Sequence, residues 1–144
     1  MTGPRRPVRG RDAAGRPVPV GSPDEVEPVP EQALPPVEAI ALARSLLAEG
    51  RPFFAHDVLE AVWKVAPTEE RDLWQGLAQV CVGLTHVQRG NAVGAARLLR
   101  RGAGRLEERA GRASYDVDVA AVARQARAVA DSVEAGGPAP TLEL

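Results

Sequence analysis

Proline and glycine divide the chain after residue 33 into five segments, each with apolar residues at helical spacing. Proline is preferred in the first turn of a helix and glycine directly after its last residue. Because the connections between the segments are short, neighbouring helices should be antiparallel. The sequence therefore predicts an all-α fold, a compact antiparallel bundle of about five helices. These helices are expected over residues 36–49, 52–66, 69–89, 92–109 and 117–135.

The fourth and fifth predicted helices each begin with a residue that can cap a helix. The pattern of the third predicted helix indicates where that helix lies in the bundle. Asn91 and Asp116 have side-chain oxygens that can accept a backbone N–H of the following turn, so we expect them to cap the fourth and fifth helices. The third helix has two stripes free of charged residues. A helix covered on two sides is typical of the centre of a bundle.

The first 33 residues differ from the rest of the chain. Nine of the 13 prolines fall within the first 36 positions, and the segment is first basic and then acidic. Such a composition offers little apolar surface to offset the entropy of ordering the chain. We expect residues 1–33 to be a flexible arm, 34–135 to be the helical domain and 136–144 to be a flexible tail.

The composition also limits the classes of protein to which the chain can belong. A net charge of −1 gives no overall attraction to nucleic acids or to a membrane surface. The apolar segments are too short to span a bilayer, and no signal-peptide core follows Met1. The single cysteine, Cys81, lies in an apolar run and should be a buried, unreactive thiol. We expect a soluble, cytoplasmic protein.

Arginines on the fourth predicted helix could suggest a phosphate-binding surface. Arg97, Arg101, Arg105 and Arg112 project to one side, but Glu108 lies among them and no aromatic residue is interleaved for stacking on bases. The pattern favours a solvated helix face over nucleic-acid binding. A solvated face of this kind is also compatible with binding to a partner protein.

The candidate functional residues lie in the second predicted helix. His56, Glu60 and Trp63 are spaced at i, i+4 and i+7, so they lie on one side of the helix, at the edge of its apolar face. Asp57 lies on the outer side. A polar pair at the edge of an apolar face is expected where one helix meets another.

The third predicted helix offers a polar stripe that could meet this pair. Gln75, Gln79 and His86 lie on one side of that helix at i, i+4 and i+11. If this stripe faces the second helix, both histidines of the chain share one seam between helices. We therefore expect His56 and Glu60 to lie close to His86 or Gln79.

Several blocks of sequence resemble one known family. The blocks "FFAHDVLEAVW", "LWQGLAQVCVGLTHVQRGN" and "GAARLL" are similar to the domain of unknown function family numbered 309, small all-helical proteins that share a His-x-x-x-Glu-x-x-Trp/Tyr motif. The motif matches at His56, Glu60 and Trp63, and the resemblance covers about residues 36–135. The family usually has Glu directly after the motif histidine, where this chain has Asp57. The resemblance implies a helical fold and a suggested metal-binding role, with no established reaction.

Three interpretations of the pair remain open. His56, Glu60 and His86 could ligate one Zn²⁺, Mn²⁺ or Fe²⁺ ion, with Asp57, Trp63, Gln75 and Gln79 in support, and a metal-bound water could then be activated for hydrolysis. The polar residues could instead form a buried hydrogen-bond network in a metal-free scaffold that binds a partner protein. Metal-free acid–base chemistry is the third interpretation. The metal content of the purified protein separates the first from the others.

Overall fold

The structure, a computed structural model, describes residues 9–144 and consists mainly of helices. A short hairpin of β1 (Arg9–Arg11) and β2 (Pro17–Pro19) precedes them. The α-helices are α1 (Pro36–Ala48), α2 (Pro52–Val65), α3 (Arg71–Gln88), α4 (Ala92–Glu107) and α5 (Val119–Glu134), with a 3₁₀ turn η1 (Thr68–Glu70) before α3. The predicted all-α bundle of five helices is confirmed.

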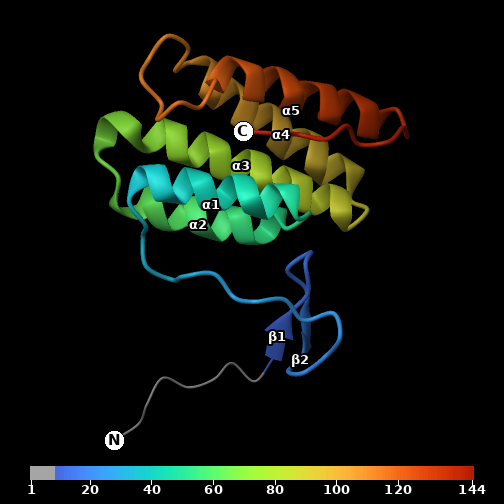
Figure 1. Ribbon diagram of the computed structural model, residues 1–144. Coiled ribbons are helices and arrows are strands. Elements are labelled where there is room, and N and C mark those ends of the chain that lie inside the picture. Colours follow the sequence, from blue (N-terminus) through green and yellow to red (C-terminus); the bar gives the residue numbers. More distant parts are fainter. Residues whose placement is uncertain (1–8) are drawn as a thin grey trace, which may run out of the picture.

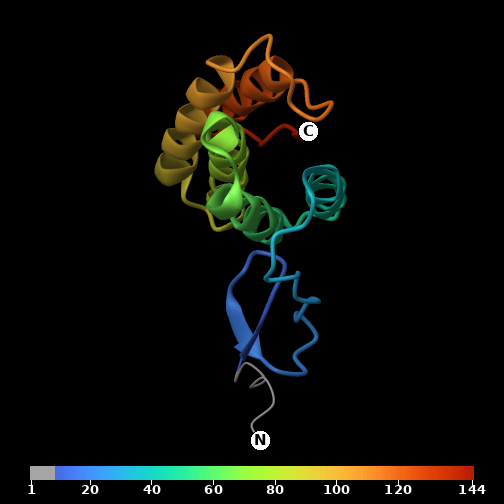
Figure 2. The ribbon, with the colours of Figure 1, turned by 90° about the vertical axis from the view of Figure 1, so that its left-hand side faces the viewer.

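Each helix packs on its neighbours in the chain, and the array is curved. The principal helix pairs are α1 with α2, α2 with α3, α3 with α4, and α4 with α5. Seen nearly end-on, the helices follow an arc from α1 to α5, and the residues after α5 return on its inner side (Figure 2). α3 lies in the middle of this arc, as its two uncharged stripes predict. α1 and α5 therefore lie at the two ends of the arc, and the tail lies between these two helices.

The helix boundaries follow the predicted signals with one exception. Proline occupies the first turn of α1 and α2, and Gly50 and Gly90 adopt positive φ one residue beyond the C-caps Glu49 and Arg89. The Asn91 side chain accepts the N–H of Gly94 and so caps α4, as predicted. The predicted cap at Asp116 is wrong. Asp118 caps α5 instead, because Asp116 has a φ of 63° and belongs to the turn before the helix.

Glycines bring α3 and α4 unusually close together. A Cβ atom at Gly102 would lie 2.8 Å from the carbonyl oxygen of Gly76, and one at Gly83 would lie 2.7 Å from Leu99 Cγ. A Cβ atom does not approach other atoms this closely, so any residue larger than glycine would push the two helices or their side chains apart. Gly102 and Ala103 therefore belong to the packed face of α4, whereas the Cβ position of Gly104 meets open space. Around this crossing the core includes the fully buried Trp74 and Cys81.

The N-terminal segment contains structure that the sequence analysis did not predict. Below the bundle in Figure 1, the hairpin turn at residues 12–16 packs against Phe53 of α2. The guanidinium groups of Arg11 and Arg89 lie 5.2 and 5.6 Å from the centre of the Phe53 ring, and Arg89 also donates to the carbonyl oxygen of Ala14. Residues 1–8 of the expected arm lie outside the described part of the chain. The flexibility of residues 1–33 stays a prediction.

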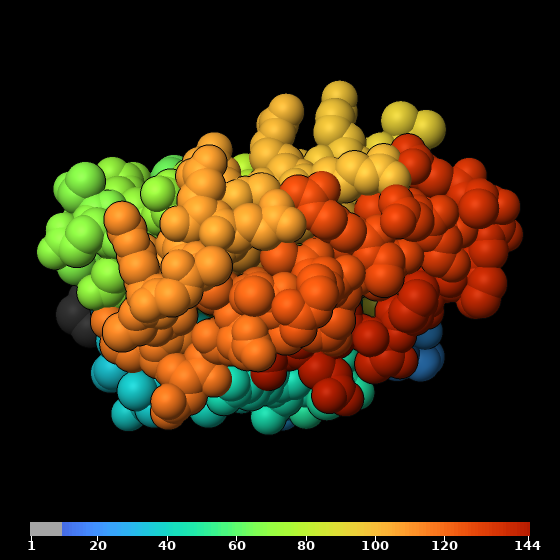
Figure 3. All heavy atoms as spheres, turned by 90° about the horizontal axis from the view of Figure 1, so that it is seen from above, coloured from blue at the N-terminus to red at the C-terminus, as the bar shows by residue number. Residues whose placement is uncertain are grey.

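The tail also makes contacts that the sequence analysis did not predict. Leu142 is buried, and Glu143 is hydrogen bonded to Gln125 of α5. The space-filling view shows the tail, in deep red, between the atoms of α5 and those of α1 (Figure 3). These contacts hold the tail at a defined place on the bundle. The flexibility expected for residues 136–144 stays a prediction.

Candidate functional site

His56 and Glu60 form the closest polar contact on α2. The Nε2 atom of His56 lies 2.5 Å from Glu60 Oε2, one helical turn away. The other oxygen of Glu60 lies 3.6 Å from Lys64 Nζ, so this carboxylate joins the histidine to a cation one turn further along. Pairs at i, i+4 on a helix surface have this geometry. The i, i+4 spacing of the motif therefore corresponds to a direct contact within α2.

The second ring nitrogen of His56 lacks a hydrogen bond. Nδ1 lies 3.4 Å from Asp57 Oδ1, but it is buried and has no aligned acceptor or donor among the described residues. Burial lowers the pKa of His56, and the carboxylates of Asp57 and Glu60 more than compensate, so the pKa lies above its ordinary value. The ring also lies beside Phe53, with the two ring centres 5.9 Å apart. His56 is thus a partly buried imidazole that keeps its proton to a higher pH than a free histidine does.

Gln79 and His86 make their polar contacts with α4 and with its cap. Gln79 accepts a hydrogen bond from Arg105 of α4, and His86 Nδ1 lies 3.1 Å from the side-chain nitrogen of Asn91, the cap of α4. The contacts of the described residues join neither Gln79 nor His86 to His56. Gln75 is half-buried on α3. Trp63 is partly buried against the core, with the guanidinium of Arg71 4.9 Å from its ring centre.

The face of α3 that carries Gln79 is fixed by glycine packing. Gly76, Gln79 and Gly83 lie on one side of the helix, and both glycines fit closely against α4. Gln79 is therefore directed toward α4 and away from α2. The glycine spacing on α3, together with Gly102 on α4, is the sequence signal that could have predicted this orientation.

The described residues do not bring the three expected metal ligands together. In residues 9–144, no group of three or more His, Cys, Asp or Glu side chains is arranged to hold a metal ion. The Nε2 atom of His56 is already paired with Glu60. Asn91 uses its oxygen as the cap of α4, so its side-chain nitrogen donates to Nδ1 of His86, which places the proton of the neutral imidazole on Nε2. The three expected ligands, His56, Glu60 and His86, are not assembled as one site.

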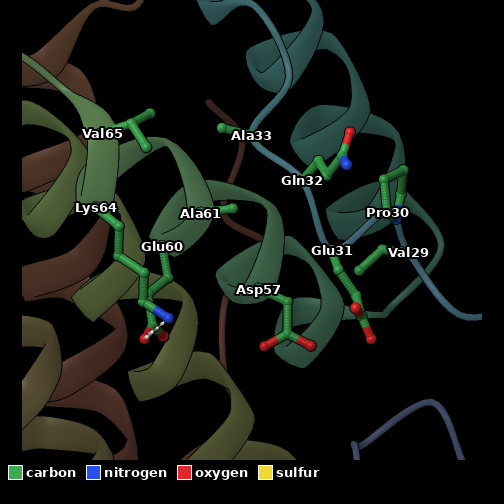
Figure 4. A pocket seen from close by; sticks show the side chains of 10 residues that line it. All are labelled: Val29, Pro30, Glu31, Gln32, Ala33, Asp57, Glu60, Ala61, Lys64 and Val65. Carbon is green, nitrogen blue, oxygen red and sulfur yellow. Dashed lines mark ion pairs between the residues drawn. The ribbon is translucent and has the colours of Figure 1, made fainter.

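A cavity of about 530 Å³ lies beside the pair, between the outer face of α2 and the extended segment at residues 29–33. In the close view, the carboxylates of Glu31 and Asp57 project toward one side of the cavity, and Glu60 is joined there to Lys64 (Figure 4). Its apolar lining is Val29, Pro30, Ala33, Ala61 and Val65. The sequence does not predict this cavity, because one of its walls is the segment expected to be a flexible arm.

The charge of this cavity is unbalanced. Glu31, Asp57 and Glu60 contribute carboxylates, and Lys64 contributes the ammonium group. Among the described residues, neither Glu31 nor Asp57 has an arginine or lysine within ion-pair distance. An adjoining cavity of about 240 Å³ shares Val29, Glu31 and Asp57 with the first. The cavity over α2 is therefore lined by both carboxylates and apolar side chains.

The sequence matches one family model with these residues inside the match. Residues 40–98 match the family described as Domain of unknown function (DUF309). The resemblance to DUF309 is confirmed. The match runs from α1 into α4 and includes His56, Glu60 and His86, whereas the hairpin, α5 and the tail lie outside it. No curated protein and no solved structure matches the chain.

None of the helices in residues 9–144 is long and apolar enough to cross a membrane. The cytoplasmic location stays a prediction.

Proposed function

We propose that this helical domain is a metal-free protein-interaction module that binds its partner at the cavity over α2. The observation that carries the proposal is the cavity itself, in which the carboxylates of Glu31 and Asp57, neither with an arginine or lysine within ion-pair distance, lie beside apolar side chains. Interaction sites with this composition bind a segment that supplies the opposite charge and an apolar anchor. The proposed partner is a protein segment with arginine or lysine beside a leucine-sized residue.

The residues around the cavity support this choice of partner. Val65 is 70% exposed at one end of the cavity, which leaves an apolar side chain open to solvent. Glu31 and Asp57 lie on opposite walls, one on the extended segment and one on α2. A basic side chain entering between them would contact both carboxylates. The partner would thereby also hold the extended segment against α2.

In this proposal the His56–Glu60 pair has a positioning role. Glu60 is held by His56 on one side and by Lys64 on the other, so its side chain is fixed at the wall of the cavity. Fixed side chains lose less conformational entropy when a partner binds. The pair therefore supports the shape of the surface without taking part in a reaction.

Binding of designed peptides tests the proposal. The probe is a capped heptapeptide of alternating leucine and arginine, labelled for fluorescence anisotropy, and the comparison peptide has glutamate in place of arginine. We expect the full chain to bind the arginine peptide and not the glutamate peptide. The double change Glu31→Gln with Asp57→Asn should weaken binding about three- to tenfold, as the loss of two partly exposed charge pairs does.

A matched control is available on α1. Glu38 is exposed and lies outside the cavity, so Glu38→Gln removes the same charge elsewhere and should leave binding unchanged. Equal binding of the two peptides, or full binding by the double variant, would rule out the cavity as a site for basic segments.

Metal titration tests the competing interpretation. Calorimetry with ZnCl₂ and with MnCl₂, and metal analysis of the purified full chain, should show no stoichiometric site. One equivalent of bound metal that is lost in both His56→Ala and Glu60→Gln would favour the metal site over the interaction surface.

A further inference from the structure

The residues after α5 turn back onto the bundle at a defined hinge. Gly136 has a φ of 78°, the N–H of Gly137 donates to the carbonyl oxygen of Ser132, and the Ser132 hydroxyl donates to the carbonyl oxygen of Pro138. Beyond this hinge, residues 138–144 have no helix or strand of their own. They run as an extended segment on the inner side of the arc (Figure 2).

Gln125 of α5 binds the backbone of this segment at two points. Its Nε2 atom donates to the carbonyl oxygen of Glu143 at 2.9 Å, and its Oε1 atom accepts the N–H of the same residue at 2.8 Å. A side-chain amide paired in this way replaces the neighbouring strand that an extended segment would have in a sheet. Since both bonds go to the backbone, the contact does not depend on the side chain at position 143.

A second set of contacts comes from α1 and α3. The Nε atom of Arg44 donates to the carbonyl oxygen of Leu144 at 3.1 Å. Leu142 is only 6% exposed and lies between α1, the start of α2 and the end of α3. The apolar residues around it are Leu47, Pro52, Leu84 and Val87. Leu84 and Val87 are half-buried residues near the end of α3, and the tail lies beside them.

The segment fills this groove incompletely. A hollow of about 160 Å³ remains beside Pro140, Thr141 and Leu142, and another of about 280 Å³ remains beside residues 141–144 on the side of α1. Residues 135–141 are all exposed, so Leu142 is the single fully buried anchor. A larger apolar side chain at the position of Thr141 could enter the first hollow, where threonine leaves space.

From these contacts we infer that the groove between α1, α3 and α5 is a binding site for an extended peptide segment of a partner protein, and that residues 138–144 occupy it as an intramolecular competitor. The partner segment has a leucine-sized residue at the position of Leu142 and an apolar residue larger than threonine before it. The unfilled hollows favour such a partner over the tail of a second copy, which would leave the same space empty. This inference does not depend on the cavity over α2.

Peptide binding to a variant with a released tail tests the inference. Leu142→Asp places a charge among the apolar residues that surround Leu142. In the full chain this change should release the tail from the groove. The probe is the acetylated and amidated peptide Pro-Ala-Pro-Thr-Leu-Glu-Leu, a copy of residues 138–144. It should bind the variant at least about tenfold more tightly than the parent chain, because a tethered competitor acts at an effective concentration in the millimolar range.

Three comparisons define the site. A peptide with leucine in place of the threonine should bind the Leu142→Asp variant about three- to tenfold more tightly than the copy, through added apolar burial. A peptide with aspartate in place of the first leucine should not bind. Adding Gln125→Ala to the variant should weaken binding, whereas the matched change Gln75→Ala on α3 should not.

Equal affinity of the copy for the parent chain and for a folded Leu142→Asp variant would overturn the inference, and so would the absence of binding to that variant. If the variant does not fold, hydrogen exchange in the parent chain decides the question. The N–H of Glu143 should be protected by Gln125, and a millimolar concentration of the leucine-substituted peptide should remove that protection. Protection that is absent, or that persists at this concentration, would count against a displaceable tail.

Discussion

His56 Nε2 and Glu60 Oε2 lie 2.5 Å apart on successive turns of α2, and the same carboxylate contacts Lys64. The contact lies at the edge of the apolar face, where the His56 side chain is 20% exposed and that of Glu60 is 36% exposed. Solvent therefore screens the pair in part, and its contribution to stability should be small. The pair should have a larger measurable effect on the pKa of His56.

The first prediction concerns the pKa of His56. In Glu60→Gln this pKa should fall, because burial, which lowers it, is then opposed mainly by Asp57. The pKa can be measured from the ring protons by NMR. Glu38→Gln, on α1, should leave it unchanged, and an unchanged value in Glu60→Gln would show that the carboxylate does not interact with the ring.

The pH dependence of stability follows from the same pair. The pKa of His56 is raised in the folded chain, so its contribution is fully present below the unfolded pKa of about 6.5 and is lost as the pH rises through the folded pKa. The parent chain should exceed Glu60→Gln in free energy of unfolding by about 0.5 kcal/mol at pH 5.5. Urea titrations across this window measure the difference. A difference that grows at high pH would contradict the assignment.

A second prediction concerns the crossing of α3 and α4. In Gly102→Ala the new Cβ atom would meet the carbonyl oxygen of Gly76 and the side chain of Val80 at 2.8 Å, so the helices must separate. We expect a loss of about 1–3 kcal/mol in the free energy of unfolding, although alanine favours helix. Gly104→Ala is the matched control, since nothing lies within 4 Å of its Cβ position, and it should gain up to about 1 kcal/mol. Equal stability of the two variants would show that the crossing is not tightly packed.

A third prediction concerns Cys81. The thiol is fully buried in α3, and burial raises its pKa to about 12, so almost no thiolate is present at neutral pH. The native chain should react with a thiol reagent at least about a hundredfold more slowly than the chain in denaturant. Rapid labelling of the folded chain would mean that the centre of α3 opens readily. The sequence predicts this buried thiol correctly from the apolar run around the cysteine.

Local signals explain why the helical fold could be predicted from the sequence. Pro36, Pro52, Gly50 and Gly90 act through the backbone of their own turn, so their effect does not depend on distant residues. The wrong cap at Asp116 arose because Asp118, two residues later, offers the same side chain. The choice between them depends on where the preceding turn ends, which the local pattern does not define.

The candidate site could be predicted only in part. The His56–Glu60 contact is a property of one helix, and the spacing alone predicts it. The expected contact with Gln79 depended on the rotation of α3, which is decided by the fit of Gly76 against α4. Such long-range packing has no signature in the spacing of polar residues.

The two extended segments were missed for a related reason. Each buries few apolar residues, with Phe53 beside the hairpin turn and Leu142 in the tail, and its other contacts are hydrogen bonds to the backbone, so neither segment has a periodic pattern. A turn signal is nevertheless present at Asp12 and Gly15, since aspartate followed three residues later by glycine is typical of a β-turn. It indicates a reversal of the chain and does not indicate where the hairpin docks.

The last prediction concerns removal of residues 1–33. The helical core does not include the hairpin, so a chain that starts at Leu34 should keep its helical circular dichroism and melt cooperatively. It should lose about 1–3 kcal/mol, because Phe53 loses the cover of the hairpin turn and its contact with Arg11. Gly15→Ala in the full chain provides the comparison: its Cβ atom would lie 2.2 Å from Phe53 Cγ, and the residue has a φ of 79°, so the change should undock the hairpin with a similar loss. A collapse of helicity on truncation would instead make the N-terminal segment an essential part of the fold.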